Sequence, residues 1–375
     1  MRLLICAGGT GGGVYPALAV LHALRKQMPD LETLWVGGAG GMEADLVERA
    51  GVPFESVPAA GVHGVGLRSL PGNLAKLGSG LLAARRVLRR FRPDALFFTG
   101  GYVAVPVALA SRMMRPRPRL LLYVPDIEPG LALKALSRFA DHIALTVEDS
   151  RAFFPRRIPA TVTGYPIRPE LTRWERPQAR ARFNLRDDSP TLLVFGGSLG
   201  ARSINRAVVR HLPALLREMQ IIHVTGQRDW AEVQEAVRAL SLEALGRYHL
   251  HAYLHGEEMG AALAAADLVL SRAGASSIGE FPYFGLPAVL VPYPHAWRYQ
   301  QVNAKYLEQR GAALVLADAA LESDLLPTLV SLARSTDRLK NMRRAMRSLA
   351  TPQAAEHIGH LVVQPPRGQG AKHHG

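Results

Sequence analysis

Short apolar runs alternate along this chain with longer stretches in which apolar residues recur at helical spacing. Near-continuous apolar strands separated by helices are typical of parallel sheets covered on both faces, and we predict one such sheet in each half. Strands are predicted at 3–7, 33–36, 95–99, 120–124, 143–146, 191–195, 221–224, 248–253, 268–271 and 288–291. Helices are predicted at 15–27, 42–50, 74–90, 204–218, 230–240, 259–265, 276–284, 300–309, 323–334 and 337–349.

The alternation loosens between residues 151 and 190, where prolines and arginines cluster. Domain boundaries fall in such segments, and a length of 375 residues suits two domains. We therefore expect an N-terminal domain at 1–160 and a C-terminal domain at 161–345. A C-terminal helix at 346–363 is expected to pack back on the first domain, and the polar, glycine-rich tail 364–375 is expected to be disordered.

Each half opens with a strand, a glycine-rich turn that carries a hydroxyl residue, and a helix. The first turn is Gly8–Gly13, with Thr10, and the second is Gly196–Gly200, with Ser198. Backbone N–H groups at a helix start carry partial positive charge and attract anions, most often phosphate. A tight structural turn is the alternative for the second loop. The pair of loops favours twin α/β domains facing a shared cleft.

The net charge of +14 indicates an anionic partner, which can be nucleic acid, an anionic membrane surface or a phosphorylated substrate. Ordinary solvated arginines are the alternative. A nucleic-acid-binding protein would explain the charge, but the chain lacks helix-turn-helix, zinc and RNA-binding signatures. The single cysteine, Cys6, excludes an internal disulfide and fits a reducing cytoplasm. No apolar run approaches the roughly 20 residues that span a bilayer.

Polar residues follow several predicted strands of the second half, and ligands of open α/β sheets bind beyond the carboxyl ends of the strands. Glu280 comes shortly after the turn at 274–277, and a carboxylate there can accept both hydroxyls of a ribose. Alternatively, Glu280 only complements a helix dipole. Gln300 lies in the polar, aromatic segment 292–304 and offers a donor and an acceptor to sugar hydroxyls; a surface loop with a capping residue is the alternative.

Taken in order, the motifs of this chain resemble the MurG family of bacterial transferases, in glycosyltransferase family 28. These enzymes add N-acetylglucosamine to undecaprenyl-pyrophosphoryl-MurNAc-pentapeptide in peptidoglycan synthesis. The resemblance extends over about residues 1–360, and the C-terminal motifs are the specific ones. The matching segments are Gly-Gly-Thr-Gly-Gly at 8–12, Gly100-Gly101-Tyr102, and the blocks at 164–168, 196–201, 271–275 and 280–304.

The resemblance implies an α/β protein of the GT-B fold, with two Rossmann-like domains whose parallel sheets face a central cleft. It implies an inverting, metal-independent transfer from UDP-GlcNAc to the muramoyl 4-hydroxyl, with no cofactor. Ser198 would contact the diphosphate, Glu280 the ribose and Gln300 the sugar. The implied donor-binding residues are Thr10, Gly11, Gly12, Asp126, Arg168, Ser198, Leu254, Glu280 and Gln300, and the acceptor-pyrophosphate residues are Gly9, Thr10, Gly100, Gly101 and Tyr102.

Two positions depart from the family pattern. The histidine that usually closes the first loop is Gly13, and the usual His-Glu-Gln-Asn stretch is replaced at 123–126, which puts Asp126 where the family has an asparagine. We expect Asp126 to be the general base, because a carboxylate has replaced an amide at the carboxyl end of a predicted strand. A turn-capping role beside Pro125 and Pro129 stays open. So do two rival functions, a GT-B transferase for another lipid acceptor and a UDP-GlcNAc epimerase.

The segment 74–90 combines leucines with basic residues. A basic amphipathic helix can bind an anionic membrane surface, and the lipid-linked acceptor implied by the resemblance stays in the bilayer. We expect a peripheral protein on the cytoplasmic face of the cell membrane, with no nucleic-acid partner. An ordinary helix with leucines in the core and arginines in water is the alternative. The expected membrane patch is Lys76, Arg85, Arg86, Arg89 and Arg90.

Overall fold

This computed structural model describes residues 1–8, 11–38, 43–59, 70–197, 200–238, 240–294 and 299–364, with the backbone alone at 70–75. The expected disordered tail lies outside these residues from position 365 on. The chain divides into two compact units. The first unit combines Met1–Pro166 with Pro352–Gly375, and the second is Ile167–Thr351.

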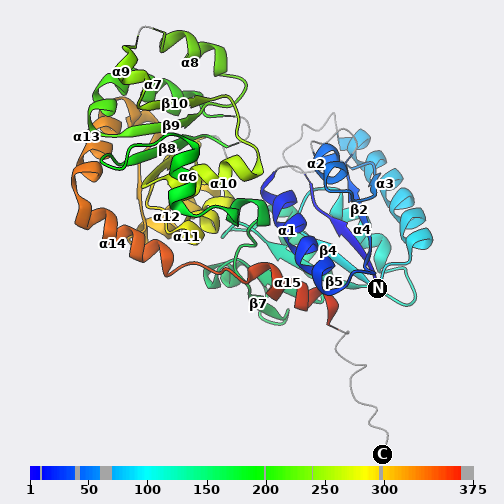
Figure 1. The fold of residues 1–375 in the computed structure, drawn as a ribbon. Coiled ribbons are helices and arrows are strands. Elements are labelled where there is room, and N and C mark those ends of the chain that lie inside the picture. The colour runs from blue at the N-terminus through cyan, green and yellow to red at the C-terminus, as the bar shows by residue number, and fades with distance from the viewer. Residues whose placement is uncertain are drawn as a thin grey trace, which may run out of the picture. The chain divides into compact units, whose positions relative to one another are not determined.

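A seven-stranded parallel sheet forms the first unit, in the order β3-β2-β1-β4-β5-β6-β7 (Figure 1). Its strands are β1 (Arg2–Cys6), β2 (Glu32–Gly37), β3 (Phe54–Ser56), β4 (Ala95–Phe98), β5 (Arg119–Val124), β6 (His142–Leu145) and β7 (Ala160–Val162). The helices of the unit are α1 (Gly11–Gln27), α2 (Glu43–Arg49), α3 (Leu70–Phe91), α4 (Ala104–Ser111), α5 (Leu131–Leu136) and α15 (Ala354–Val363).

Both faces of this first sheet are covered. Successive side chains of a strand point to opposite faces, so Leu3 and Ile5 pack into the cluster that includes α1 and α15. Leu4 and Cys6 pack into the opposite cluster, with α3 and α4. Burial on both faces explains why the strand reads as a continuous apolar run.

A six-stranded parallel sheet forms the second unit, in the order β10-β9-β8-β11-β12-β13. Its strands are β8 (Thr191–Phe195), β9 (Gln220–Val224), β10 (Tyr248–His251), β11 (Leu268–Ser271), β12 (Ala288–Leu290) and β13 (Ala313–Val315). Its helices are α6 (Arg176–Arg182), α7 (Arg202–Glu218), α8 (Trp230–Ala236), α9 (Leu242–Leu245), α10 (Gly256–Ala265), α11 (Glu280–Phe284), α12 (Tyr299–Gln309), α13 (Leu321–Arg334) and α14 (Thr336–Arg347).

The predicted fold class is confirmed, but one predicted helix is broken in two. The segment 276–284 folds as a 3₁₀ turn, Ala275–Ile278, followed by the short helix α11. Pro282 explains the break, because a continuous helix would need its missing N–H to bond the carbonyl of Ile278. Placed in the first turn of a new helix, the same proline costs nothing.

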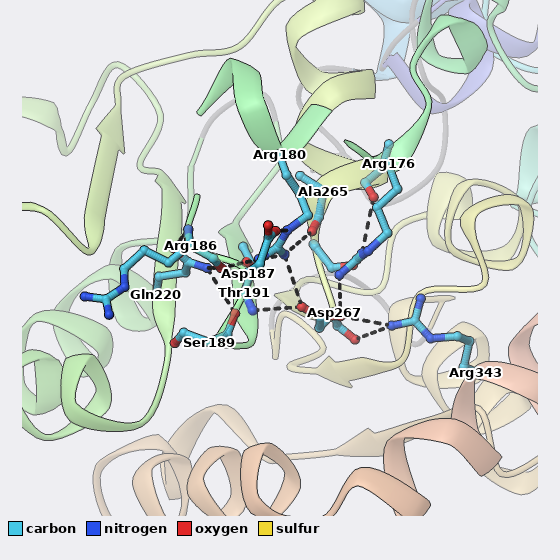
Figure 2. A network of polar contacts seen from close by, with 12 residues as sticks. Arg176, Arg180, Arg186, Asp187, Ser189, Thr191, Gln220, Ala265, Asp267 and Arg343 are labelled. Carbon is cyan, nitrogen blue, oxygen red and sulfur yellow. Dashed lines mark hydrogen bonds and ion pairs between the residues drawn. The ribbon is translucent and has the colours of Figure 1, made fainter. Parts of the chain in front are cut away.

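The amino ends of β8 and β11 are tied together by one carboxylate, Asp267 (Figure 2). It accepts hydrogen bonds from Arg176 Nη2 at 2.6 Å, Arg343 Nη2 at 3.4 Å and the Thr191 N–H at 3.0 Å. Arg180 Nη1 lies 3.6 Å from the same group. These arginines hold α6 and α14 to the sheet, so part of the chain's positive charge has a structural role. Among the described helices, none combines the length and hydrophobicity needed to cross a bilayer.

Candidate active site

The glycine turn of the second unit joins β8 to α7. Ser198, the hydroxyl residue expected to contact a diphosphate, lies outside the described residues, and Gly197 and Gly200 border the undescribed positions 198–199. Gly200 has a φ of +79°, in the left-handed region, and a Cβ at this position would collide with the carbonyl oxygen of Thr225. Only glycine lets the turn after β8 approach the turn after β9 so closely.

A buried chain of polar side chains holds these two turns together. Asn205, on α7, donates from Nδ2 to Thr225 O and to Asp229 Oδ2, both at 2.9 Å. Its Oδ1 therefore accepts from His223 Nε2 at 3.0 Å, and His223 Nδ1 accepts from the Tyr248 hydroxyl at 2.7 Å. Burial lowers the pKa of His223 to about 3, so the imidazole is neutral at physiological pH.

The sequence contains a signal for this hydrogen-bond network that our predictions did not use. His223 interrupts an apolar strand run, and Asn205 falls between Ile204 and the apolar positions that follow on α7. A buried polar residue needs a partner, so each of them indicated a tertiary hydrogen bond.

Arg168 and Glu280 are brought together inside the second unit. Arg168 Nη2 lies 3.5 Å from Glu280 Oε1, and the two side chains are 14% and 8% exposed. Arg168 Nη1 also lies 3.9 Å from Glu170 Oε1. Burial raises the pKa of Glu280, and the guanidinium of Arg168 opposes that rise by stabilising the ionised form. Both predicted donor-binding residues therefore form one charged pair.

Arg272 connects three segments of the second unit: the start of α7, the residue after β12 and the 3₁₀ turn Asp318–Ala320. It donates to the Val291 carbonyl at 3.0 Å, to Asp318 Oδ1 at 2.5 Å and to the Ser203 hydroxyl at 2.8 Å. Its guanidinium also lies over the ring of Tyr293, 5.2 Å from the centroid. Arg272 appeared in a motif block, but its role as the centre of this network was not predicted.

Gln300 lies in the first turn of α12, next to the residues 295–298 that are not described. Its Oε1 accepts a hydrogen bond from the Tyr293 N–H at 2.8 Å, which orients the amide. Asn303, buried on the same helix, donates to the Ala273 carbonyl at 3.1 Å and ties α12 to the turn after β11. The predicted donor residue Leu254 is 7% exposed and packs in the core of the unit.

In the first unit, Gly11 and Gly12 are the opening residues of α1, and the predicted residues Gly9 and Thr10 lie outside the described ones. Gly100 and Gly101 follow β4. A Cβ at Gly101 would lie 3.2 Å from the carbonyl oxygen of Gly8, so the turns after β1 and β4 touch.

Two further predicted residues of the first unit, Tyr102 and Asp126, follow β4 and β5. Tyr102 comes directly after the glycine pair and is 53% exposed. Asp126 is half-buried, and its charge raises the pKa of Tyr123, although burial of that phenol is the larger cause. The Tyr123 hydroxyl lies 2.7 Å from Thr146 Oγ1. These facts place Asp126 at the carboxyl edge of the first sheet and leave its role as base a prediction.

The expected membrane patch lies on α3, which packs against α4. Lys76, Arg86, Arg89 and Arg90 are exposed, and Arg85 is half-buried. Arg90 forms an ion pair with Glu55. Leu82, on the same helix, is 59% exposed, and Met113 just after α4 is 58% exposed. The described part of the chain holds no group of three or more His, Cys, Asp or Glu residues able to bind a metal ion.

Two family models match most of the chain. The glycosyltransferase family 28 N-terminal domain matches residues 3–145, and the glycosyltransferase family 28 C-terminal domain matches residues 191–358.

The chain belongs to glycosyltransferase family 28.

Named relatives match nearly the whole length of the chain. A protein of Roseiflexus sp. (strain RS-1) is 42% identical, over 96% of this chain and 94% of its own. A protein of Moorella thermoacetica is 40% identical, over 97% and 99%. Both are named UDP-N-acetylglucosamine–N-acetylmuramyl-(pentapeptide) pyrophosphoryl-undecaprenol N-acetylglucosamine transferase.

Solved structures show the same fold. MurG of Acinetobacter baumannii superposes with a TM-score of 0.74 at 28% identity, covering 96% of this chain and 99% of that one. A UDP-GlcNAc 2-epimerase of Neisseria meningitidis gives a TM-score of 0.67 at 12% identity, covering 96% and 99%. The second likeness extends to the fold alone.

Proposed function

We propose that this family 28 enzyme transfers N-acetylglucosamine from UDP-GlcNAc to the muramoyl 4-hydroxyl of undecaprenyl-pyrophosphoryl-MurNAc-pentapeptide. The names of relatives that match 96–97% of this chain support this substrate pair. The structural observation that carries it is the Arg168–Glu280 pair at 3.5 Å, in the same unit as the glycine turn before α7. A carboxylate at this position can accept hydrogen bonds from two ribose hydroxyls, as a nucleoside diphosphate sugar requires.

Each part of the donor has a proposed contact. The N–H groups around Gly197 and Gly200, with Ser198, bind the diphosphate, because amides at a glycine turn before a helix attract anions. Glu280 binds the ribose and Gln300 the sugar. Arg168 contacts the donor and also stabilises the charge of the departing UDP. The networks of Asn205 and Arg272 support this site by fixing the turns that carry these groups.

The reaction needs a base as well as a donor site. The muramoyl 4-hydroxyl attacks the anomeric carbon, the bond to UDP breaks with inversion, and the hydroxyl proton passes to a base. We propose Asp126 as that base, because it follows β5 at the carboxyl edge where ligands of parallel sheets bind. The acceptor pyrophosphate lies against the glycine turns after β1 and β4. The proposed reaction uses its two substrates and no cofactor.

The proposed location is the cytoplasmic face of the cell membrane, with α3 on the anionic lipid surface. Exposed basic side chains beside the exposed Leu82 support this orientation. Basic residues contribute electrostatic attraction, and apolar ones insert among the lipids.

Incubation of the protein with labelled UDP-GlcNAc and a short-chain lipid acceptor analogue tests the function. We expect a disaccharide-linked lipid and UDP in equal amounts, and no consumption of donor when the acceptor is omitted. An enzyme that epimerises UDP-GlcNAc would convert the donor without acceptor, and chromatography of the nucleotide sugar would reveal that outcome. Absence of the disaccharide product under all conditions would refute the proposal.

A further inference from the structure

Glu43 is a buried carboxylate that uses only one of its two oxygens. It is the first residue of α2 and is 3% exposed. Oε1 accepts a hydrogen bond from the Gly38 N–H at 3.1 Å. Oε2 is buried and accepts no hydrogen bond from any described residue. A buried acceptor without a partner is costly, which is why such atoms are rare in native proteins.

Two glycines, which have no Cβ, leave room for the Glu43 side chain. A Cβ at Gly8 would lie 2.5 Å from Oε1, and a Cβ at Gly37 would lie 3.1 Å from Cγ of Glu43. The carboxylate therefore lies directly against the ends of β1 and β2. Its charge also contributes to the raised pKa of the Cys6 thiol, although burial is the larger cause.

This position is at the carboxyl edge of the first sheet, where parallel sheets bind ligands. Gly8 lies between Glu43 and the turn after β4. It is close to Glu43 Oε1 on one side, and on the other a Cβ at Gly101 would lie 3.2 Å from its carbonyl oxygen. Structure and sequence thus put an unsatisfied carboxylate oxygen beside the glycine turns that we assign to the acceptor. Among the described residues, no basic side chain hydrogen-bonds to Glu43.

We propose that Glu43 Oε2 accepts a hydrogen bond from a neutral donor group of the acceptor substrate, a sugar hydroxyl or an amide N–H. This inference rests on the proposed function. A carboxylate oxygen cannot serve as a contact for the acceptor pyrophosphate, because two anions repel each other strongly at a buried site. Glu43 therefore recognises the sugar or its peptide and positions that part of the acceptor.

Glu43→Gln tests this assignment with little change in shape. Its amide oxygen can still accept from the Gly38 N–H, while an NH₂ group replaces Oε2 and turns an acceptor into a donor. We expect the KM for the lipid acceptor to rise about tenfold or more, as for the loss of one hydrogen bond to a charged group, with the Kd for UDP unchanged. Glu48→Gln, an exposed position on the same helix, is the matched control and should leave both constants unchanged.

The outcomes separate this inference from the function on which it rests. If wild-type protein makes no disaccharide product, the proposed function fails. If wild type is active and Glu43→Gln keeps its acceptor KM, or loses kcat alone, the assignment of Oε2 is wrong. Glu43→Asp keeps the charge, but its shorter side chain moves the carboxylate away from the acceptor, so this variant should also have a raised acceptor KM. An acceptor analogue without the peptide distinguishes a sugar hydroxyl from a peptide amide as the donor. With this analogue, the difference in acceptor KM between wild type and Glu43→Gln should become smaller only if Oε2 binds a peptide amide.

Discussion

The guanidinium of Arg168 and the carboxylate of Glu280 face each other in the second unit, with 3.5 Å between Nη2 and Oε1. Burial favours the neutral form of Glu280 and so raises its pKa, whereas the adjacent cation favours the ionised form. The ionised fraction of Glu280 is therefore set by the balance between burial and the charge of Arg168. Donor binding should depend on that balance.

Replacing Arg168 by Gln removes the opposing charge, so the pKa of Glu280 rises further. The ionised fraction then declines at a higher pH, and UDP affinity should weaken as the pH falls from 7.5 to 5.5. Calorimetric titration of UDP at several pH values measures this, and the wild-type affinity should change less over the same interval. Arg173→Gln, an exposed arginine that pairs with Glu257, is the control. Equal pH slopes in wild type and Arg168→Gln would contradict the argument.

His223 gives a second pH dependence, this time in stability. Its folded-state pKa is about 3, below the ordinary value of 6.5, so between these values the unfolded chain binds a proton that the folded chain does not. The contribution of His223 is therefore fully present above pH 6.5 and is lost as the pH falls, by about 1.4 kcal/mol per pH unit.

His223→Gln should unfold in urea with a smaller loss of stability between pH 6.5 and pH 4.5 than wild type. The variant is expected to be less stable at pH 7.5, because Asn205 and Tyr248 lose the imidazole that they contact. His357→Gln, at an exposed position on α15, supplies the comparison. Parallel stability curves for wild type and His223→Gln would show that the imidazole does not control acid sensitivity.

The sequence was most informative where an element is buried on both faces. Strands β8 and β11 have the predicted bounds 191–195 and 268–271, because their apolar runs end where the backbone leaves the sheet. The three-residue strands β3 and β13 were missed, since so short a segment shows no period, whereas β12, equally short, was found because its apolar run extends over 288–291. α4 was missed because its sequence is apolar on all sides and so lacks a helical stripe.

The candidate site was predictable in its residue types and less so in its contacts. Glycine turns and Glu280 could be found from spacing and chemistry. The partners could not, because Arg168 reaches Glu280 from a distant segment and only the fold brings them together. Glu43 was not singled out for the same reason, because its environment comes from other strands and turns. Asn205 carried a signal, as a polar residue among apolar positions, but its partners on other elements could not be predicted.

Asp126 is the proposed base, and Asp126→Asn removes the basic oxygen while keeping the shape of the side chain. We expect kcat to fall by about 10²–10⁴-fold, the usual contribution of general base catalysis, while UDP still binds. Transfer assays at saturating substrate measure kcat, and calorimetry measures UDP binding. Asp45→Asn, exposed on α2, is the control. Near-normal turnover of Asp126→Asn or Asp126→Ala would reassign the residue to capping the turn after β5.

Binding to anionic vesicles should depend on the exposed basic side chains of α3. Lys76, Arg86 and Arg89 are exposed, and each basic residue near an anionic surface contributes about 1 kcal/mol. Reversing all three to Glu should therefore weaken binding to phosphatidylglycerol vesicles by roughly 100-fold or more in a sedimentation assay.

The matched control for α3 reverses the same number of charges on another exposed helix. Arg338, Lys340 and Arg344 of α14, changed together to Glu, give the same net charge as the α3 variant. If net charge alone drove binding, the two variants would lose affinity equally. A loss confined to the α3 variant, with transfer to a soluble acceptor analogue intact, would show that α3 is the membrane-facing surface. Equal binding by wild type and the α3 variant would exclude that helix as the contact.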